Sequence, residues 1–144
     1  MYYSIGEKLV RIKEEEISEP FVAVLTSDGF KKDALPPGFD RSVMQHYPQQ
    51  RFCKAEVHKE MLSGTISVPD KKCFDKKMAF SYYINSSGVI FIDDSGLVAG
   101  LIEKTKNSVL WREPSVGHFF YTFLETLVEN DLMHLEDIED RLAK

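Results

Sequence analysis

Two adjacent carboxylates, Asp93 and Asp94, directly follow the apolar run Val89–Ile92. In α/β proteins the carboxyl end of a buried strand is a common position for metal ligands or catalytic carboxylates. The same residue types also cap helices, because their side-chain oxygens accept the free N–H groups of the first helical turn. No basic or nucleophilic side chain accompanies the pair at a recognisable spacing. We therefore expect Asp93, Asp94 or Ser95 to cap a helix that begins near Leu97.

The remaining candidates for chemistry do not form a recognised motif. Gly96 and Gly100 lack the Lys-Ser/Thr of a phosphate loop and the spacing of a dinucleotide-binding fold, and no Gly-x-Ser-x-Gly is present. The histidines show neither His-Glu-x-x-His spacing nor close pairing with cysteine, and we interpret them as surface or edge residues. They are His46, His58, His118 and His134. We predict that the chain is not an enzyme, and we assign it no catalytic, cofactor-binding or metal-binding residue.

The excess negative charge lies at the end of the chain. The net charge is −5, from 18 basic and 23 acidic side chains, and residues 1–113 are balanced at 16 of each. Residues 114–144 therefore disfavour nucleic acid and anionic membrane surfaces as partners, whereas divalent cations or a basic protein face suit them. An ordinary solvated helix face is the alternative interpretation. The acidic residues are Glu125, Glu129, Asp131, Glu136, Asp137, Glu139 and Asp140.

At 144 residues the chain has the length of one ordinary domain, and its 43% hydrophobic and 28% charged composition is globular. Runs and alternations of apolar residues predict a mixed β-sheet packed with helices, of the α/β or mixed α+β class. Ser27 or Asp28 is expected to cap a short helix that ends at Pro36, and residues 36–51 read as a loop or poorly specified helix. The expected strands are Tyr2–Ile5, Leu9–Ile12, Phe21–Leu25 (covered on both faces), Phe52–Val57, Leu62–Val68, Met78–Ile84 and Val89–Ile92, with a hairpin at residues 85–88 and a helix to about Asn107.

A long helix is predicted from Ser115, its cap candidate, to the end of the chain. Apolar residues recur at alternating steps of three and four, at positions 121, 124, 128, 135, 138 and 142. Position 131 belongs to the same spacing but is occupied by Asp. Phe119, Phe120, Phe123 and Leu127 widen the apolar face, so we expect this part to dock on the sheet. We divide the chain into a sheet domain at 1–113 and an acidic helix at 114–144.

The end of this helix carries no stop signal. The stripe still runs at Leu142, and acidic residues crowd what would be the negative end of the helix dipole, at about 0.3–1 kcal/mol each. We therefore expect the helix to continue in the parent gene product. No apolar run approaches the roughly 20 residues that cross a bilayer, and no signal peptide is visible, so we expect exposure to the cytosol. Cys53 and Cys73 are then interpreted as free thiols.

Two stretches resemble the CorA-type magnesium transporters. The aromatic start and acidic continuation of Phe119–Leu142, with its Leu-Glu-x-Ile-Glu-Asp-x-Leu ending, are similar to the helix that precedes the stalk in that family. The hairpin Met78–Ile92, the helix after it and Trp111-Arg-Glu resemble the segment just upstream. The family's Gly-Met-Asn pore signature is absent from this chain.

The resemblance implies a cytosolic α/β domain that continues into a stalk helix and two membrane helices, in an inner- or plasma-membrane protein. It also implies a homopentamer that conducts Mg²⁺ and related divalent ions, with regulatory Mg²⁺ between neighbouring cytosolic domains favouring the closed pore. Other copies of the chain and divalent cations would be its partners, and it would meet the membrane only through the missing C-terminal segments. The regulatory ligands are not identified.

Two other functions remain open from the residues alone. One is a stand-alone cytosolic interaction module whose acidic helix pairs with another protein. The other is a metal-dependent hydrolase that uses Asp93 and Asp94, although the companions such a site needs are missing.

Overall fold

The computed structural model describes residues 1–40, 54–58, 61–69, 77–108 and 113–142. Several predictions concern other residues: the free thiols Cys53 and Cys73, the conformation of 41–51, His46 and Trp111. The side chains of His58 and His134 also lie outside what is described.

Within the described ranges, seven strands form one mixed sheet in the order β2-β1-β3-β7-β6-β5-β4. All pairs are antiparallel except β3 with β7, which run parallel, and this confirms the predicted mixed sheet. The strand predicted at 52–57 is observed as β4, residues 52 and 53 lie outside the described residues, and β5 is longer than predicted. The strands are β1 (Tyr2–Ile5), β2 (Leu9–Ile12), β3 (Phe21–Leu25), β4 (Lys54–His58), β5 (Met61–Pro69), β6 (Lys77–Ile84) and β7 (Gly88–Ile92).

The parallel pair β3 and β7 forms the middle of the sheet. In register, Phe21 lies opposite Gly88 and Leu25 opposite Ile92. All five residues of β7 are buried, as are four of the five in β3. A strand that is buried on both faces has a continuous run of apolar residues in its sequence instead of an alternation of apolar and polar residues. Both segments could therefore be predicted as buried strands.

The turn between β6 and β7 is stabilised by a side chain. Asn85 Oδ1 accepts hydrogen bonds from the backbone N–H groups of Ser87 at 2.8 Å and Gly88 at 3.2 Å. The hairpin predicted at residues 85–88 is confirmed, and Gly88 does not have the positive φ that is found at Gly38 and Gly96. Its actual role is steric: a Cβ there would lie 2.5 Å from the Phe21 carbonyl oxygen. The central parallel pair therefore requires glycine at this register position.

Three α-helices and a short 3₁₀ turn, η1 (Glu14–Glu16), accompany the sheet in the part of the chain that the structure describes. The prediction for α1 (Ser27–Lys32) was wrong at both ends. The cap is Thr26, whose Oγ1 accepts from Gly29 N at 3.0 Å, because Thr26 is the residue that keeps an extended backbone. The helix ends before Asp33, which also returns to an extended conformation. The other helices are α2 (Leu97–Ser108) and α3 (Val116–Leu142).

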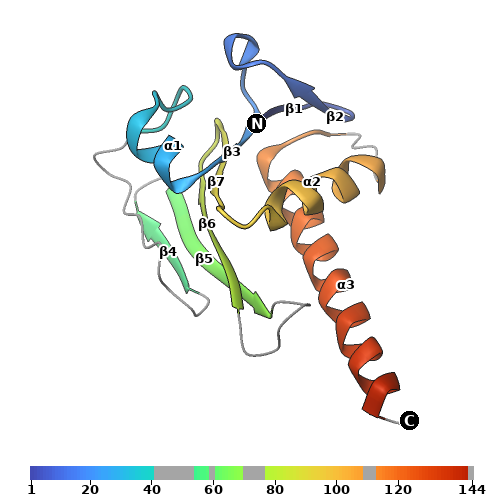
Figure 1. The fold of residues 1–144 in the computed structure, drawn as a ribbon. Coiled ribbons are helices and arrows are strands. Elements are labelled where there is room, and N and C mark those ends of the chain that lie inside the picture. Colours follow the sequence, from blue (N-terminus) through green and yellow to red (C-terminus); the bar gives the residue numbers. More distant parts are fainter. Residues whose placement is uncertain (41–53, 59–60, 70–76, 109–112, 143–144) are drawn as a thin grey trace.

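The helices lie on opposite faces of the sheet (Figure 1). On one face α2 and α3 pack on residues of β1, β3, β6 and β7, including Tyr3, Val22 and Phe91. On the other face Phe30 of α1 stacks on Tyr83 of β6 with ring centroids 5.9 Å apart. The sheet is therefore the middle layer of three, with the larger apolar cluster on the side of α2 and α3.

Candidate functional site

The paired carboxylates after β7 act as helix caps. Asp93 is 6% exposed, and its Oδ2 accepts a hydrogen bond from Val98 N at 2.9 Å. Its Oδ1 accepts from both the backbone N–H and the hydroxyl of Ser95, at 2.9 and 2.6 Å. Ser95 Oγ in turn accepts from Leu97 N at 3.3 Å. Asp93 and Ser95 together satisfy free donors at the start of α2, as the capping interpretation predicted.

Asp94 serves a different helix. One carboxylate oxygen accepts from the backbone N–H of Ser27 at 2.9 Å, and the other accepts from the Ser27 hydroxyl at 2.6 Å. Ser27 is the first residue of α1, so this carboxylate also lies at a helix N-terminus, where the dipole favours negative charge. The parallel pairing of β3 and β7 brings the two segments together. Both aspartates of the proposed hydrolase site therefore hold helix starts.

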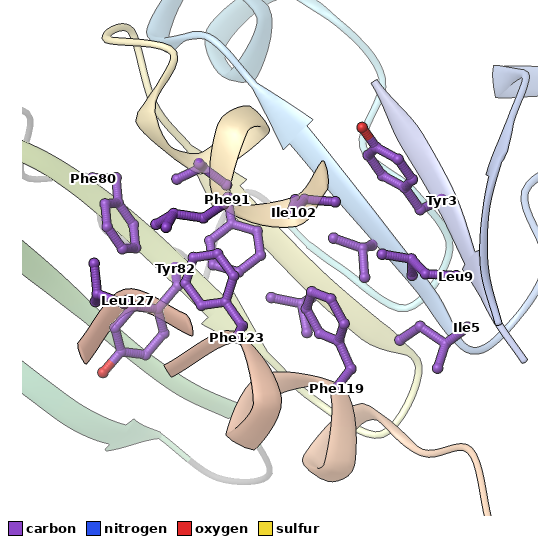
Figure 2. Packing of buried hydrophobic residues seen from close by; sticks show 14 of the residues in the cluster. Tyr3, Ile5, Leu9, Phe80, Tyr82, Phe91, Ile102, Phe119, Phe123 and Leu127 are labelled. Atoms are coloured by element: carbon purple, nitrogen blue, oxygen red, sulfur yellow. The ribbon is translucent and has the colours of Figure 1, made fainter. Parts of the chain in front are cut away.

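An aromatic cluster anchors the first half of α3 to the sheet (Figure 2). Phe123 is fully buried, with its ring centroid 4.7 Å from that of Phe91 on β7 and 5.9 Å from that of Phe80 on β6. Phe120 lies 5.1 Å from Tyr82, centroid to centroid. The predicted docking of α3 through its phenylalanines and Leu127 is confirmed.

A hydroxyl contact fixes α3 against α2. The Thr105 hydroxyl of α2 is fully buried and donates to Leu101 O at 2.9 Å. The Thr105 hydroxyl also lies 3.2 Å from Thr126 Oγ1 of α3. Thr126 Oγ1 itself donates a hydrogen bond to Thr122 O at 3.0 Å. A buried hydroxyl needs a defined partner, so this contact sets the register of one helix along the other.

The start of α3 is capped as predicted. Ser115 Oγ accepts from His118 N at 3.1 Å, and Ser115 O accepts from Phe119 N at 3.1 Å. The His118 ring nitrogen Nδ1 lies 2.6 Å from Glu113 O, so the side chain of His118 makes a local hydrogen bond with the backbone just before α3.

A tyrosine attaches α2 to β1, the strand next to the edge strand β2. Tyr3 of β1 is fully buried, and its hydroxyl donates to Glu103 Oε1 of α2 at 3.4 Å. Burial raises the pKa of Tyr3 above its usual value, and the nearby charge of Glu103 raises it further. The neutral phenol is therefore the form that the native structure favours.

The second half of α3 extends away from the sheet (Figure 1). The acidic side chains that are described along α3 as a whole are exposed: Glu125, Glu129, Glu136, Glu139 and Asp140. Among the residues that the structure describes, no three His, Cys, Asp or Glu side chains come together as a metal site. The described part of one copy therefore does not fit a bound Mg²⁺, and we derive no step through such an ion.

No helix among the described residues has both the length and the apolar content required to cross a membrane. No family model matches the chain, and no curated protein matches it in sequence. Solved structures do match it. The complete CorA magnesium transporter from Methanocaldococcus jannaschii aligns with a TM-score of 0.62 at 16% identity, over 99% of this chain and 50% of that one.

The fold is CorA-like. The full-length CmaX protein aligns as well, with a TM-score of 0.67 at 11% identity over 99% of this chain and 49% of CmaX. The CorA-like domain therefore spans about half the length of the solved proteins that it matches. The resemblance stated for the two sequence stretches holds at the level of the fold and extends over nearly the whole chain.

The contacts that position these elements could not be predicted from the sequence. Asp94 was recognised as a capping residue, but its partner, Ser27, lies 67 positions away in the chain. The Thr105–Thr126 contact had no sequence signal, because threonine within a helix is more often explained by a bond to its own backbone. The interpretation of Asp93 and Ser95 as caps of α2 was confirmed, whereas Asp94 binds the start of α1, so the two adjacent aspartates link two helices.

Proposed function

We propose that this chain is the cytosolic regulatory domain of a CorA-like divalent-cation transporter. The observation that carries the proposal is the alignment of nearly the whole chain with half of a magnesium transporter. The absence of any spanning helix among the described residues leaves conduction itself to another part of such a protein. We propose a regulatory and non-enzymatic role, which agrees with the use of Asp93 and Asp94 as helix caps.

The mechanical part of the proposal rests on how α3 is held. Its first half is fixed to the sheet by Phe119 and Phe123, and to α2 by the hydroxyl of Thr126. Its second half extends beyond the sheet. A helix clamped at one end moves with the platform that holds it, so a rotation of the sheet domain would shift the far end of α3. We propose that residues 1–113 form the platform and residues 114–144 transmit its position.

Intracellular Mg²⁺ is the proposed signal, and contacts between copies are its proposed place of action. The described residues of one copy do not assemble a ligand set, so neighbouring copies of a homo-oligomer, a pentamer by resemblance, would share the ligands. A ligand that binds one arrangement of copies better than another shifts the population toward that arrangement.

Sedimentation velocity with and without MgCl₂ tests the proposal. We expect millimolar Mg²⁺ to increase the self-associated fraction of the 144-residue chain, reversibly on addition of EDTA. NaCl at matched ionic strength is the control, because simple screening of the acidic helix would affect both salts alike. An unchanged distribution at every Mg²⁺ concentration, or an equal response to NaCl, would count against Mg²⁺ sensing by this domain.

A further inference from the structure

Three large apolar side chains lie in one exposed line on α3. Tyr121 is 67% exposed, Val128 55% and Leu142 82%. Their spacing of seven and fourteen residues places them along the same side of the helix, as in the seam of a coiled coil. Among the residues that the structure describes, the other exposed large apolar side chains are Met1 and Val10, at the opposite end of the chain. We call Tyr121, Val128 and Leu142 the outer line.

The outer line has no role in attaching α3 to its own domain. The residues that attach α3 are Phe119, Phe123 and Leu127, all of which are buried against the sheet. At about 100° of rotation per residue, Phe119 and Phe123 lie on the opposite half of the helix from Tyr121 and Val128, and Leu127 lies at the margin of that half. The long helix therefore carries a second apolar line, in which Leu124 packs against the core while Tyr121, Val128 and Leu142 are exposed.

Acidic residues flank the outer line on one side. At about 100° per residue, Glu125, Glu129 and Glu136 all lie to the same side of it, away from the face that packs on the sheet. Each of these carboxylates is exposed, as are Glu139 and Asp140. At the same rotation per residue Glu139 falls in the line itself, between Val128 and Leu142, so the surface is a narrow apolar line bordered and interrupted by negative charge.

We propose that the outer line is a docking site for an amphipathic helix of another polypeptide that carries lysine or arginine beside its own apolar stripe. Helix pairs of this kind bury their apolar seams together, and flanking charges of opposite sign select the partner and its orientation. A second copy of the chain suits the site poorly, because an antiparallel pair would bring the acidic flanks together. The proposal is independent of Mg²⁺ sensing and of transport.

Binding of two synthetic helical peptides by fluorescence anisotropy tests the proposal. Both peptides carry leucine at heptad a and d positions, and one has lysine at its flanking positions where the other has glutamate. We expect the lysine peptide to bind at least about tenfold more tightly in low salt, and most of that difference to disappear in 1 M NaCl. Equal binding of the two peptides, or no binding of either, would overturn the proposal.

Matched substitutions locate the site. Val128→Ser should weaken binding of the lysine peptide about tenfold, whereas Val10→Ser should leave it unchanged, because Val10 is similarly exposed at 53% but lies on β2. Both variants retain the buried core, and circular dichroism checks that the helix content is unchanged. Equal effects of the two substitutions would contradict docking on α3.

Charge substitutions separate the acidic flank from general electrostatics. Replacing Glu125 and Glu129 with glutamine should reduce the preference for the lysine peptide, and the same change at Glu14 and Glu15 of η1 should not. Sedimentation of the protein alone must show that the outer line is free at the protein concentration used. A dimer that Val128→Ser dissociates would overturn the proposal in favour of a second copy as the occupant.

Discussion

Replacing Phe123 with alanine tests how firmly α3 is attached to the sheet. The Phe123 ring is fully buried, and its centroid lies 4.7 Å from that of Phe91, 5.9 Å from that of Phe80 and 6.1 Å from that of Phe119. Truncating a buried phenylalanine to alanine removes its transfer free energy and leaves a cavity, at a total cost of about 3–5 kcal/mol. A domain of this size is typically stable by about 5–15 kcal/mol, so the loss is a large share of the total.

Urea unfolding followed by far-UV circular dichroism measures the effect. With an m-value of about 1–3 kcal/mol/M, the midpoint for Phe123→Ala should fall by at least about 1 M. Tyr121→Ala is the matched control, since it removes an aromatic ring two residues earlier on the same helix but from a site that is 67% exposed. Its free energy of unfolding should change by no more than about 0.5 kcal/mol.

Two results would refute the anchoring of α3. One is a loss of less than about 1 kcal/mol in the free energy of unfolding for Phe123→Ala, since removing a ring that fills space in the core costs more than that. The other is an equal loss for Tyr121→Ala, which would mean that the outer line, rather than the phenylalanine face, holds the helix.

Further substitutions test other parts of the structure. Gly88→Ala should lower the free energy of unfolding by about 1–3 kcal/mol, because the new Cβ would meet the Phe21 carbonyl. Gly100 lies inside α2 with open space around it, so Gly100→Ala should raise the free energy of unfolding by up to about 1 kcal/mol. Asp93→Ala should cost about 1–3 kcal/mol in urea unfolding, since it leaves Val98 N buried without its partner. The pKa of Tyr3 is raised in the folded state, so the neutral phenol stabilises the fold below the pKa of an unfolded tyrosine, near 10. This stabilisation is lost as the pH rises further. Tyr3→Phe should therefore flatten the fall in the free energy of unfolding that is measured above about pH 10. A slope that Tyr3→Phe leaves unchanged would contradict that role.

Local patterns in the sequence predicted most of the elements. The run Phe21–Leu25 and the alternation in 62–68 identify strands, because side-chain direction in a strand repeats every two residues. The Asp93-Asp94-Ser95 segment identified the start of α2 for a similar reason, since capping depends on a few adjacent residues. These features concern neighbours in the chain, and propensity and spacing are enough to recognise them.

The docking face of α3 was harder to predict, because two apolar faces compete on one helix. The outer line has the more regular spacing, but the buried face has the larger side chains. Each buried aromatic ring removes roughly 150–250 Å² from water, and this outweighs the regularity of a line that includes Val128. The sequence analysis identified the phenylalanines as docking residues but did not separate them from the line through Tyr121.

Long-range pairings lay beyond sequence reasoning. The contact between Asp94 and Ser27 exists because β3 and β7 are parallel neighbours, and strand order is not encoded in either segment alone. Prediction was also limited at short range, at the N-terminus of α1. Thr26, Ser27 and Asp28 are three consecutive residues that could each cap a helix, and the backbone conformation selects Thr26.

Sequencing the native gene beyond the codon for Lys144 tests the transporter assignment most directly. A CorA-like transporter requires the reading frame to continue through a long helical segment into two apolar stretches of about 20 residues each. A stop codon after Lys144, or a continuation without any stretch able to cross a bilayer, would contradict the assignment and leave only the CorA-like fold.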